Sequence, residues 1–527
     1  MDLAIKKPLE IVYPTGAAKW ILVLTAISCA VLELIDATIV NVSLREISGN
    51  IGATTTEIAW VVTAYAISNV IIIPLASMLS DLFGRRVYFT VSVIIFTFAS
   101  LMCGFSTNLW TLVMWRFIQG LGGGGLLSTA QTIILGAFPP NKISTANAIF
   151  GMGMILGPTL GPTLGGVITD NLSWHWIFFV NIPIGVTAAI LSWTYVTNTP
   201  GATKPKKIDW WGIIFLVIAI GSLQFVLEEG MSKDWFESTE IVLPTITFVL
   251  GLVAFIYREL SIDYPAVNIR LYKNYNLAMG SLMNFMLGLM LFGTVFIFPL
   301  FVQISLGWTA TQTGFFMIPG ALCTAFAMPV VGAMLGKGRN PKNIIIMGIL
   351  MTFGFLMMLA FSSPDSSQKN FYLPFVLRGV GLAFMMGPIL SLAVAGLRGK
   401  DLGQAVGLAN MIRQLGGSVG IALINVFLTD KNAEIRSSMI SNINPYNNAA
   451  TDRIAAMTQN YISNGYSPGD AELLAYKAMD GLVTRQQMLV SYDQGFFTIG
   501  ILVLTCIPIV FLIRYKKGAK ATVVSDH

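Results

Sequence analysis

Residues 20–42 read WILVLTAISCAVLELIDATIVNV, an almost unbroken apolar stretch that contains two acidic residues, Glu33 and Asp36. At 1.5 Å per residue the stretch would form a helix of about 35 Å, which is enough to cross a hydrocarbon core of roughly 30 Å. It is too long for the core of a signal peptide, and no small-residue cleavage site follows it. We therefore interpret it as a retained transmembrane helix.

Similar apolar runs recur along the chain of 527 residues, which is 55% hydrophobic and only 11% charged. A soluble protein carries about 25% charged residues. Only helices and closed barrels satisfy the backbone in lipid, and runs of about twenty residues are too long for barrel strands. The sequence therefore predicts an all-α polytopic membrane protein. Its 14 predicted spans are residues 20–42, 57–79, 87–106, 110–136, 145–169, 175–197, 209–229, 240–259, 277–303, 312–336, 342–362, 370–398, 403–429 and 492–514.

The basic residues predict the orientation of the chain. The formal net charge is +6, but the basic residues lie in short loops between apolar runs, so we expect no nucleic-acid partner. With the N-terminus in the cytoplasm, 21 of the 32 Lys and Arg residues fall in cytoplasmic segments or span ends, eight fall outside, and three lie deep in spans. This bias predicts two cytoplasmic termini and an even number of spans, in the cell (inner) membrane.

The chain also contains an internal repeat. Arg116 and Arg378 are 262 residues apart, and Asn147 and Asn410 are 263 apart. Similar offsets predict two six-helix halves related by duplication, with two extra helices between them. Repeated halves around a site near the midplane are typical of secondary transporters. The predicted units are an N-terminal six-helix bundle (1–198), a two-helix insertion (199–270) and a C-terminal six-helix bundle (271–527) that includes an external loop (430–491).

Glu33 and Asp36 are the only acidic residues deep inside predicted spans. An ionised group in the membrane is costly and indicates a functional site by default. The i, i+3 spacing places both carboxyl groups on one helix face. Burial and mutual repulsion favour their protonated forms, so the pair would hold a proton near neutral pH and titrate as a unit. The alternative is a hydrogen-bonded structural pair.

Three buried arginines accompany these acids. Arg116 is expected about 10 Å outward of the midplane and Asp36 about 7 Å outward, so the two would meet if their helices are neighbours. A cation there would compete with protonation of the acids; the alternative is an arginine satisfied by helix carbonyls. Arg378 and Arg413 have no deeply placed acidic partner in the second half. They would pair across the cavity, face carbonyls or meet anionic substrates.

Two local motifs add to this pattern. Residues 153–166 read GMILGPTLGPTLGG, with glycine every fourth residue and prolines at 158 and 162. This spacing predicts very close packing against a neighbouring helix, with bends at the prolines; the alternative is an ordinary packing seam. Residues 81–86 read DLFGRR in a short loop, where an acid precedes two arginines. We interpret this as a charge latch, although a basic loop alone would reflect only orientation.

Together these motifs resemble the major facilitator superfamily, in its fourteen-helix drug:proton antiporter branch of the EmrB and QacA type. The resemblance covers nearly the whole chain. Ser77 stands where the gate motif usually begins with glycine, and Glu33 lies outside the branch motif. The matching segments are Leu34–Val42 (helix 1 motif), Asp81–Arg86 (cytoplasmic gate), Arg116–Gly122 (proton transfer), Gly157–Gly166 (antiporter motif of exporters), and Trp176–Gly185 with the long final external loop (EmrB type).

The resemblance implies a proton-driven multidrug efflux antiporter that exports lipophilic small molecules by alternating access. It implies no enzymatic activity, no metal and no cofactor other than the coupling proton. Asp36 is expected to be the main coupling residue, and Glu33 to alter proton stoichiometry or substrate charge preference. The remaining alternatives are an uptake symporter and an exporter of one specific metabolite. The implied sites are proton coupling (Asp36, Glu33, Arg116), gate (Asp81, Gly84, Arg85, Arg86), antiporter motif (Gly157, Pro158, Gly161, Pro162, Gly165, Gly166), and substrate or structural roles (Asn41, Gln119, Arg378, Arg413).

The external loop at residues 430–491 is much longer than the others and mixes polar with large apolar residues. A disordered linker would carry fewer large apolar groups, so we expect a small ordered cap. The resemblance implies that this loop docks a periplasmic adaptor of a tripartite pump with an outer-membrane channel. The competing interpretation is a lid that packs on the transporter and gates exit.

Overall fold

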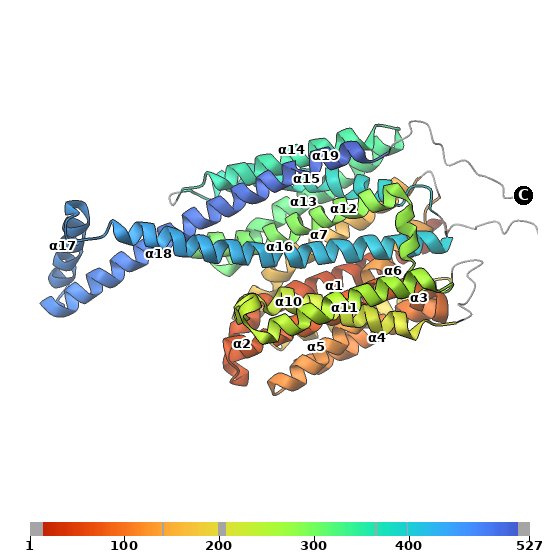
Figure 1. Cartoon of the computed structure of the whole chain (residues 1–527), viewed down its shortest axis with the longest axis horizontal. Helices are drawn as coiled ribbons and strands as arrows, with labels where there is room; N and C mark the ends of the chain where they lie inside the picture. The colour runs from red at the N-terminus through yellow and green to blue at the C-terminus, as the bar shows by residue number, and fades with distance from the viewer. Residues whose placement is uncertain (1–13, 140–141, 199–206, 364–365, 398, 515–527) are drawn as a thin grey trace, which may run out of the picture.

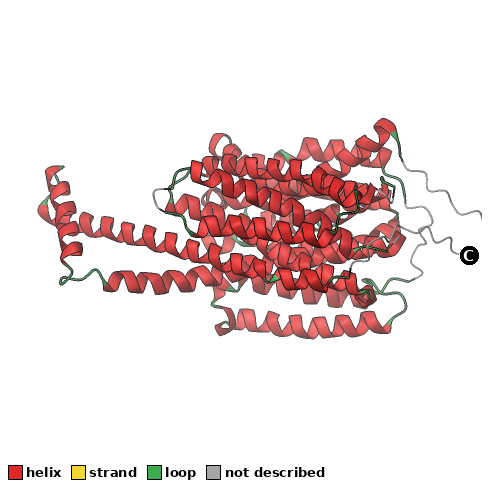
Figure 2. Cartoon of the chain, turned by 90° about the horizontal axis from the view of Figure 1, so that it is seen from above, coloured by secondary structure: helices red, strands yellow, loops and turns green. Residues whose placement is uncertain are grey.

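The computed structural model describes residues 14–139, 142–198, 207–363, 366–397 and 399–514. All regular secondary structure in these residues is helical, and the long helices form one bundle from which an arm extends (Figures 1 and 2). The principal helices are α1 (Gly16–Ile51), α3 (Trp60–Phe83), α4 (Arg85–Gly104), α5 (Leu109–Gly123), α6 (Leu126–Gly136), α7 (Ile143–Asn171), α8 (Trp176–Phe179), α9 (Asn181–Tyr195), α10 (Trp210–Glu229), α11 (Thr239–Ser261), α12 (Tyr275–Leu300), α13 (Ala310–Gly336), α14 (Pro341–Ala360), α15 (Lys369–Ala393), α16 (Gly399–Ser441), α17 (Asn448–Ser463), α18 (Pro468–Leu504) and α19 (Cys506–Leu512). Short helical segments are α2 (Thr55–Ile58), η2 (Met231–Lys233), η3 (Trp235–Glu237), η4 (Ile269–Lys273) and the π-helix η5 (Phe301–Ser305).

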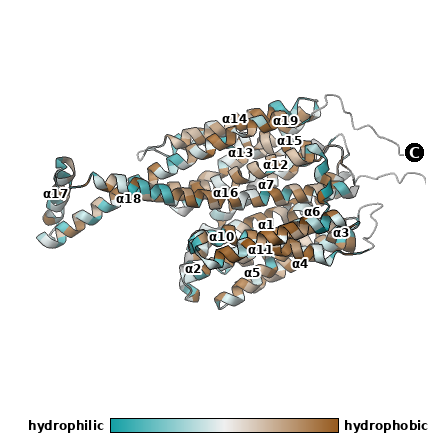
Figure 3. Cartoon of the chain, in the orientation of Figure 1, coloured by the Kyte–Doolittle hydropathy of each residue, from teal (hydrophilic) through white to brown (hydrophobic). Residues whose placement is uncertain are grey.

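Twelve helices in the described part of the chain are long and apolar enough to cross a membrane. Two predicted spans lie outside this set. The span at 110–136 is divided into α5 and α6, of 15 and 11 residues, and the span at 145–169 lies within α7, which is rich in glycine, proline and threonine. Apolar residues dominate the bundle, whereas the arm is more polar (Figure 3). The chain is therefore an all-α, multi-pass membrane protein; the count of fourteen and the side of each terminus stay predictions.

The two halves meet along α7, which packs against α1 on one side and α13 on the other. The inserted helix α10 packs against α3 and also contacts α16, and α11 packs mainly against α10. The inserted pair therefore sits at the outer edge of the seam between the halves. The predicted boundary at 198/199 adjoins residues 199–206, and Lys204, Lys206 and Arg398, which were used for orientation, lie outside the described residues.

Two hydrogen-bonded contacts between the halves follow the internal repeat. Asn147 Nδ2 on α7 donates to Ser391 Oγ on α15 at 3.2 Å. Asn410 Nδ2 on α16 donates to Ser128 Oγ on α6 at 3.2 Å, and to Gln131 Oε1 at 2.9 Å. Residues 147 and 410 are 263 apart, and so are 128 and 391. The same offset therefore relates the two asparagines and the two serines, so each contact is the counterpart of the other in the predicted duplication. We name these two contacts the paired amide clamps.

The predicted external loop differs most from expectation. The spans at 403–429 and 492–514 are parts of longer helices, because α16 continues to Ser441 and α18 begins at Pro468. Arg436 Nη2 on α16 pairs with Asp480 Oδ1 on α18 at 2.5 Å, which ties the two helices together beyond the bundle. The segment is thus a helical arm with α17 at its far end, and it projects away from the bundle (Figures 1 and 2). The segment expected to be a small ordered cap is therefore ordered, but as an extended arm, because its polar residues prolong both helices.

Candidate functional site

The carboxylate of Asp36 on α1 is fully buried and bound by three side chains from two other helices. Arg116 Nη1 donates to Asp36 Oδ2 at 2.5 Å. Gln119 Nε2 and Asn181 Nδ2 both donate to Asp36 Oδ1, at 2.9 and 2.7 Å. The contact between Asp36 and Arg116 is the one that their similar predicted depths suggested. We name these four residues the Asp36 cluster.

Arg116 is held from several directions. Besides Asp36, its Nη1 donates to Gln119 Oε1 at 2.9 Å, and its Nε donates to the carbonyl of Val61 on α3 at 3.2 Å. Its guanidinium carbon lies 4.0 Å from the ring centroid of Tyr65. Both sequence alternatives for Arg116 therefore hold in part, because it pairs with the acid and also binds a helix carbonyl.

Glycines place Arg116 at this position. A Cβ on Gly120 would lie 2.0 Å from Ser68 Oγ and 2.6 Å from the carbonyl oxygen of Tyr65, both on α3. A Cβ on Gly122 would lie 2.7 Å from the backbone nitrogen of Phe96 on α4. Helix α5 can therefore approach α3 and α4 closely only because these positions lack side chains. This approach brings the preceding turn, with Arg116 and Gln119, to α1.

Glu33 lies one turn before Asp36 on α1 and has a different environment. Its Oε1 accepts a hydrogen bond from Asn69 Nδ2 on α3 at 2.8 Å. Its Oε2 is buried and has no hydrogen-bond partner among the described residues, and the whole residue is 5% exposed. The backbone carbonyl of Glu33 accepts a longer bond of 3.4 Å from the Tyr65 hydroxyl. The two acids are thus close in sequence but are not equivalent in their contacts.

Sequence reasoning assigned no role to Asn69 and Asn181, which bind the two carboxyl groups. Each is a single amide within an apolar run, and this is the signal that was available. By contrast, Asn41 is exposed and takes no part in the Asp36 cluster. Gln119, for which the resemblance implies a substrate or structural role, is a member of the cluster.

The glycine motif of α7 packs against α1, the helix that carries both acids. A Cβ on Gly157 would lie 2.3 Å from Leu34 Cβ, and one on Gly161 would lie 1.9 Å from Thr38 Oγ1. A Cβ on Gly165 would lie 2.5 Å from the Val42 side chain. Pro158 and Gly166 are buried and Pro162 is half-buried, and α7 continues through both prolines. The close approach predicted from the spacing is present, and its partner is α1.

The other face of α7 meets the second half of the protein. A Cβ on Gly314 of α13 would lie 2.4 Å from Thr163 Oγ1. Nearer the end of α7, Thr311 Oγ1 of α13 donates to Asp170 Oδ2 at 3.5 Å. Helix α7 is therefore packed between the acid-bearing helix and the opposite half.

The gate motif forms the turn between α3 and α4. Gly84 has a φ of +86°, a conformation that favours glycine, and a Cβ there would lie 3.0 Å from Asn198 Oδ1. Arg85 donates through Nε and Nη2 to the carbonyl of Thr197 at 3.0 and 2.8 Å. The backbone N–H of Arg86 donates to Asn198 Oδ1 at 3.1 Å. The turn is therefore fastened to the segment that follows α9.

Asp81 lies in the last turn of α3. Among the described contacts, neither Arg85 nor Arg86 forms an ion pair with it, so a latch within the motif stays a prediction. Ser77, at the first position of the motif, lies near the opposite half, since a Cβ on Gly403 of α16 would be 3.2 Å from Ser77 Oγ. The motif therefore borders the seam.

Arg378 and Arg413 are both buried, with 5% and 4% of their surface exposed. The guanidinium carbon of Arg378 lies 5.6 Å from the Phe375 ring centroid. Within the described residues, neither arginine has a hydrogen-bond or ion-pair partner. Arg413 lies on α16, which packs against α3, the helix that carries Asn69. Pairing across the cavity, facing carbonyls and meeting anionic substrates therefore stay predictions for both arginines.

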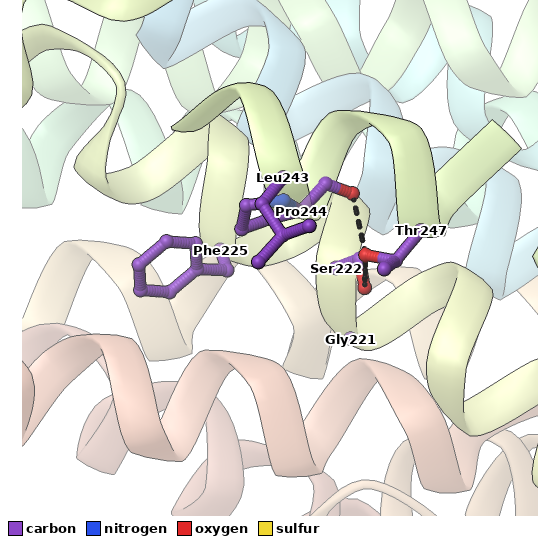
Figure 4. A pocket seen from close by; sticks show the side chains of 6 residues that line it. All are labelled: Gly221, Ser222, Phe225, Leu243, Pro244 and Thr247. Carbon is purple, nitrogen blue, oxygen red and sulfur yellow. Dashed lines mark hydrogen bonds between the residues drawn. The ribbon is translucent and has the colours of Figure 1, made fainter. Parts of the chain in front are cut away.

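Two surface cavities lie apart from the acids. The first, of about 340 Å³, lies between α10 and α11, where the hydroxyls of Ser222 and Thr247 are 3.0 Å apart (Figure 4). The second, of about 460 Å³, lies between the ends of α1 and α7. The first is lined by Gly221, Ser222, Phe225, Leu243, Pro244 and Thr247, and the second by Val42, Glu46, Gly49, Asn50, Thr169 and Asp170. Neither lining includes Glu33 or a member of the Asp36 cluster.

Comparison with known proteins finds relatives of this chain and a solved structure with the same fold. The chain is 31% identical over 485 residues to the fatty acid resistance protein FarB of Neisseria gonorrhoeae, covering 92% of this chain and 94% of that protein. It is 31% identical over 443 residues to the multidrug export protein EmrB of Escherichia coli (strain K12), covering 84% and 85%. The human organic anion transporter MFSD10 (TETRAN) shares the fold, with a TM-score of 0.60, 14% identity, and coverage of 95% of this chain and 100% of that one.

The sequence profile described as Major Facilitator Superfamily matches residues 26–421, a segment that contains the Asp36 cluster, the gate motif and the α7 glycines. Together with the relatives at about this level of identity, the match fixes the family. The chain therefore belongs to the Major Facilitator Superfamily, as a multi-pass membrane transporter rather than an enzyme.

Proposed function

We propose that this protein is a proton-driven antiporter that exports lipophilic small molecules. The Asp36 cluster carries the proposal, because an ion pair in the membrane-spanning part of a transporter is expensive to maintain and indicates a proton or ion pathway. The names of the relatives, multidrug export and fatty acid resistance, support export of lipophilic compounds. The α7 glycine motif supports export over uptake through its resemblance to the antiporter motif.

Alternating access would use the seam along α7. The paired amide clamps lie on the predicted cytoplasmic side, so they must open when the transporter faces inward. The contacts of Gly314 and Thr311 with α7 lie on the predicted outer side and must open when it faces outward. Protonation from outside would favour the inward return, and substrate binding would favour loss of the proton. Such mutual exclusion is thermodynamic linkage between two ligands.

Everted membrane vesicles test the direction of transport. The probe compounds come from a susceptibility panel in an efflux-deficient host with and without the gene. An antiporter should release protons from the acidic lumen when such a compound is added, whereas an uptake symporter should move proton and compound in the same direction. Vesicles without the protein are the control. Failure of every lipophilic compound, with response to one metabolite alone, would favour a specific exporter.

We further propose that the helical arm docks a periplasmic adaptor. The arm projects from the bundle and exposes large apolar side chains, since Tyr446 is 95% exposed, Leu473 56% and Tyr476 52%. Exposed apolar groups on an ordered element indicate a binding surface. Of the described residues, α17 packs mainly on α18, so the arm does not cover the bundle as a lid would.

Replacing residues 442–467 with a short flexible linker separates docking from the lid. Under docking, the shortened protein should transport normally in liposomes but should not confer resistance in a cell with an outer membrane. Loss of liposome transport in a correctly folded variant would favour the lid and reject the adaptor.

A further inference from the structure

We infer that Glu33, rather than Asp36, carries the proton that this transporter exchanges, and that Arg413 of the opposite half stabilises Glu33 when the proton leaves. The inference rests on the proposed antiport and departs from the expectation that the family motif sets for Asp36. It follows from the hydrogen-bond geometry around each carboxyl group.

Asp36 is bound as a carboxylate. All three of its partners are N–H donors: Oδ1 accepts from two of them, and Oδ2 accepts from the guanidinium of Arg116, whose charge attraction a proton on Asp36 would remove. The donors cannot simply turn around. Gln119 is oriented because its Oε1 accepts from Arg116, and Asn181 is oriented because its Nδ2 also donates to Ser100 Oγ at 3.0 Å. Ser100 in turn donates to the carbonyl of Phe178 at 2.9 Å, which leaves its oxygen as the acceptor for Asn181. Protonation of Asp36 would therefore remove the negative charge that strengthens all three bonds.

Glu33 has room for a proton. Asn69 occupies Oε1, and Oε2 is buried without a hydrogen-bond partner in the described part of the chain. An ionised carboxylate with a bare buried oxygen is costly, because the lost hydration is not replaced. A proton on Oε2 removes the charge and leaves the bond from Asn69 intact. The surroundings of Glu33 thus fit the neutral acid, whereas those of Asp36 fit the anion.

The charged and titratable groups that face Glu33 come from its own helix and three others. Asp36 on α1 disfavours a second negative charge nearby, and Tyr65 on α3 uses its hydroxyl on the Glu33 carbonyl. Arg116 on α5 is already paired with Asp36. Arg413 lies on α16, which packs against α3, the helix whose Asn69 binds Glu33, and Arg413 has no hydrogen-bond or ion-pair partner among the described residues. Buried Glu33, whose Oε2 has no partner in the described residues, and buried Arg413 therefore lie in opposite halves on either side of the seam.

The proton balance of the cycle follows. Facing the cytoplasm, neutral Glu33 releases one proton to water as substrate binds, and its carboxylate moves toward the guanidinium of Arg413. After substrate leaves on the outer side, one external proton returns to Oε2 and the attraction to Arg413 is lost. Asp36 stays ionised throughout, so the site exchanges one proton per cycle. The charge attraction between α1 and α16 links the proton to the relative position of the halves.

Infrared difference titration of the full-length protein in lipid tests the assignment without any substrate. The probe is the proton alone, read as the carbonyl stretch of protonated carboxyl groups while pH is varied. Glu33→Gln should remove one titrating component, and Asp36→Asn, if folded, should not. Persistence of every component in Glu33→Gln would overturn the inference, and this variant decides even if Asp36→Asn does not fold. Other acids, such as buried Glu259 and half-buried Asp493, should appear equally in parent and variant.

Arg413 is tested in the same titration. Arg413→Gln should extend the Glu33 component to higher pH, because a cation that favours the carboxylate has been removed. The matched control, Arg378→Gln, removes an equally buried arginine and should leave that component in place. Equal behaviour of the two variants would reject the role of Arg413. The titration measures no transport, so a negative result rejects the role of Glu33 or Arg413 but not the proposed antiport. A Glu33 component in the titration without proton-coupled transport in vesicles would reject the antiport instead.

Discussion

Replacing Gly161 with alanine would place a methyl group 1.9 Å from Thr38 Oγ1 and 3.0 Å from the carbonyl oxygen of Ile35 on α1. Ordinary contact begins near 3.4 Å, so α1 and α7 would have to separate by about 1.5 Å or Thr38 would have to rotate. Rotation relieves only the hydroxyl, since the Ile35 carbonyl belongs to the backbone.

The structure also restricts which helix can move. At 100° per residue, Asp36 lies on nearly the opposite face of α1 from Thr38. A shift of α1 away from α7 would drive Asp36 toward Arg116, which is already 2.5 Å away. Helix α7 must therefore move instead, toward Gly314 of α13. Overpacking of this kind costs roughly 1–3 kcal/mol, and better helix propensity returns about 1 kcal/mol, so we expect a net loss on the order of 1 kcal/mol.

The assay combines thermal unfolding of the purified protein with export per folded molecule. Gly161→Ala should unfold at lower temperature and export more slowly, and Gly161→Leu should block turnover while the protein still reaches the membrane. Gly387→Ala is the matched control, because Gly387 lies within α15 with no atom within 4 Å of its Cβ position. Adding Thr38→Ala should restore part of the loss. If Gly161→Ala matches Gly387→Ala in both measurements, the close-packing account is wrong.

Three further predictions concern contacts around the seam and the site. Asn147→Ala and Asn410→Ala should each destabilise the conformation that is closed on the cytoplasmic side by about 1 kcal/mol. A cysteine placed on that side should then be labelled more than in the parent protein, and equal labelling would exclude a role for the clamps. Gly84→Ala should destabilise the turn, because its φ is +86° and its Cβ would meet Asn198, and an unchanged unfolding temperature would contradict this. Asn181→Ala leaves Asp36 with two donors, so proton-coupled export should fall. Asn181→Asp places a second carboxyl group beside Asp36 and should impair export further. Export at the parental rate in both variants would show that Asn181 has no functional role in the Asp36 cluster.

Hydrophobicity and residue depth were sufficient for the helical fold and for the meeting of Asp36 with Arg116, because the bilayer restricts both to one axis. The spacing of the α7 glycines predicted a close approach but not its partner, since a glycine face accepts any helix. Asn69 and Asn181 were missed because a single amide in an apolar run has no periodic signal. The sequence predicts a loop where the structure has the arm, because hydropathy detects the end of a membrane span but not the end of a helix. Polar residues here end the span while the helix continues.

Polar contacts within the first half are stronger than those across the seam, and rocking of one half against the other requires this difference. Within the first half, Asp36 accepts charge-assisted bonds from Arg116, Gln119 and Asn181, and such bonds are stronger than bonds between neutral groups. Across the seam the described polar contacts are neutral or long, such as Asn147 with Ser391 at 3.2 Å and Thr311 with Asp170 at 3.5 Å. A neutral bond contributes only about 0.5–1.5 kcal/mol net. Each half can therefore move as a body while the seam opens at one end, and under the inferred proton exchange a charge on Glu33 would favour the arrangement that brings it nearer to Arg413.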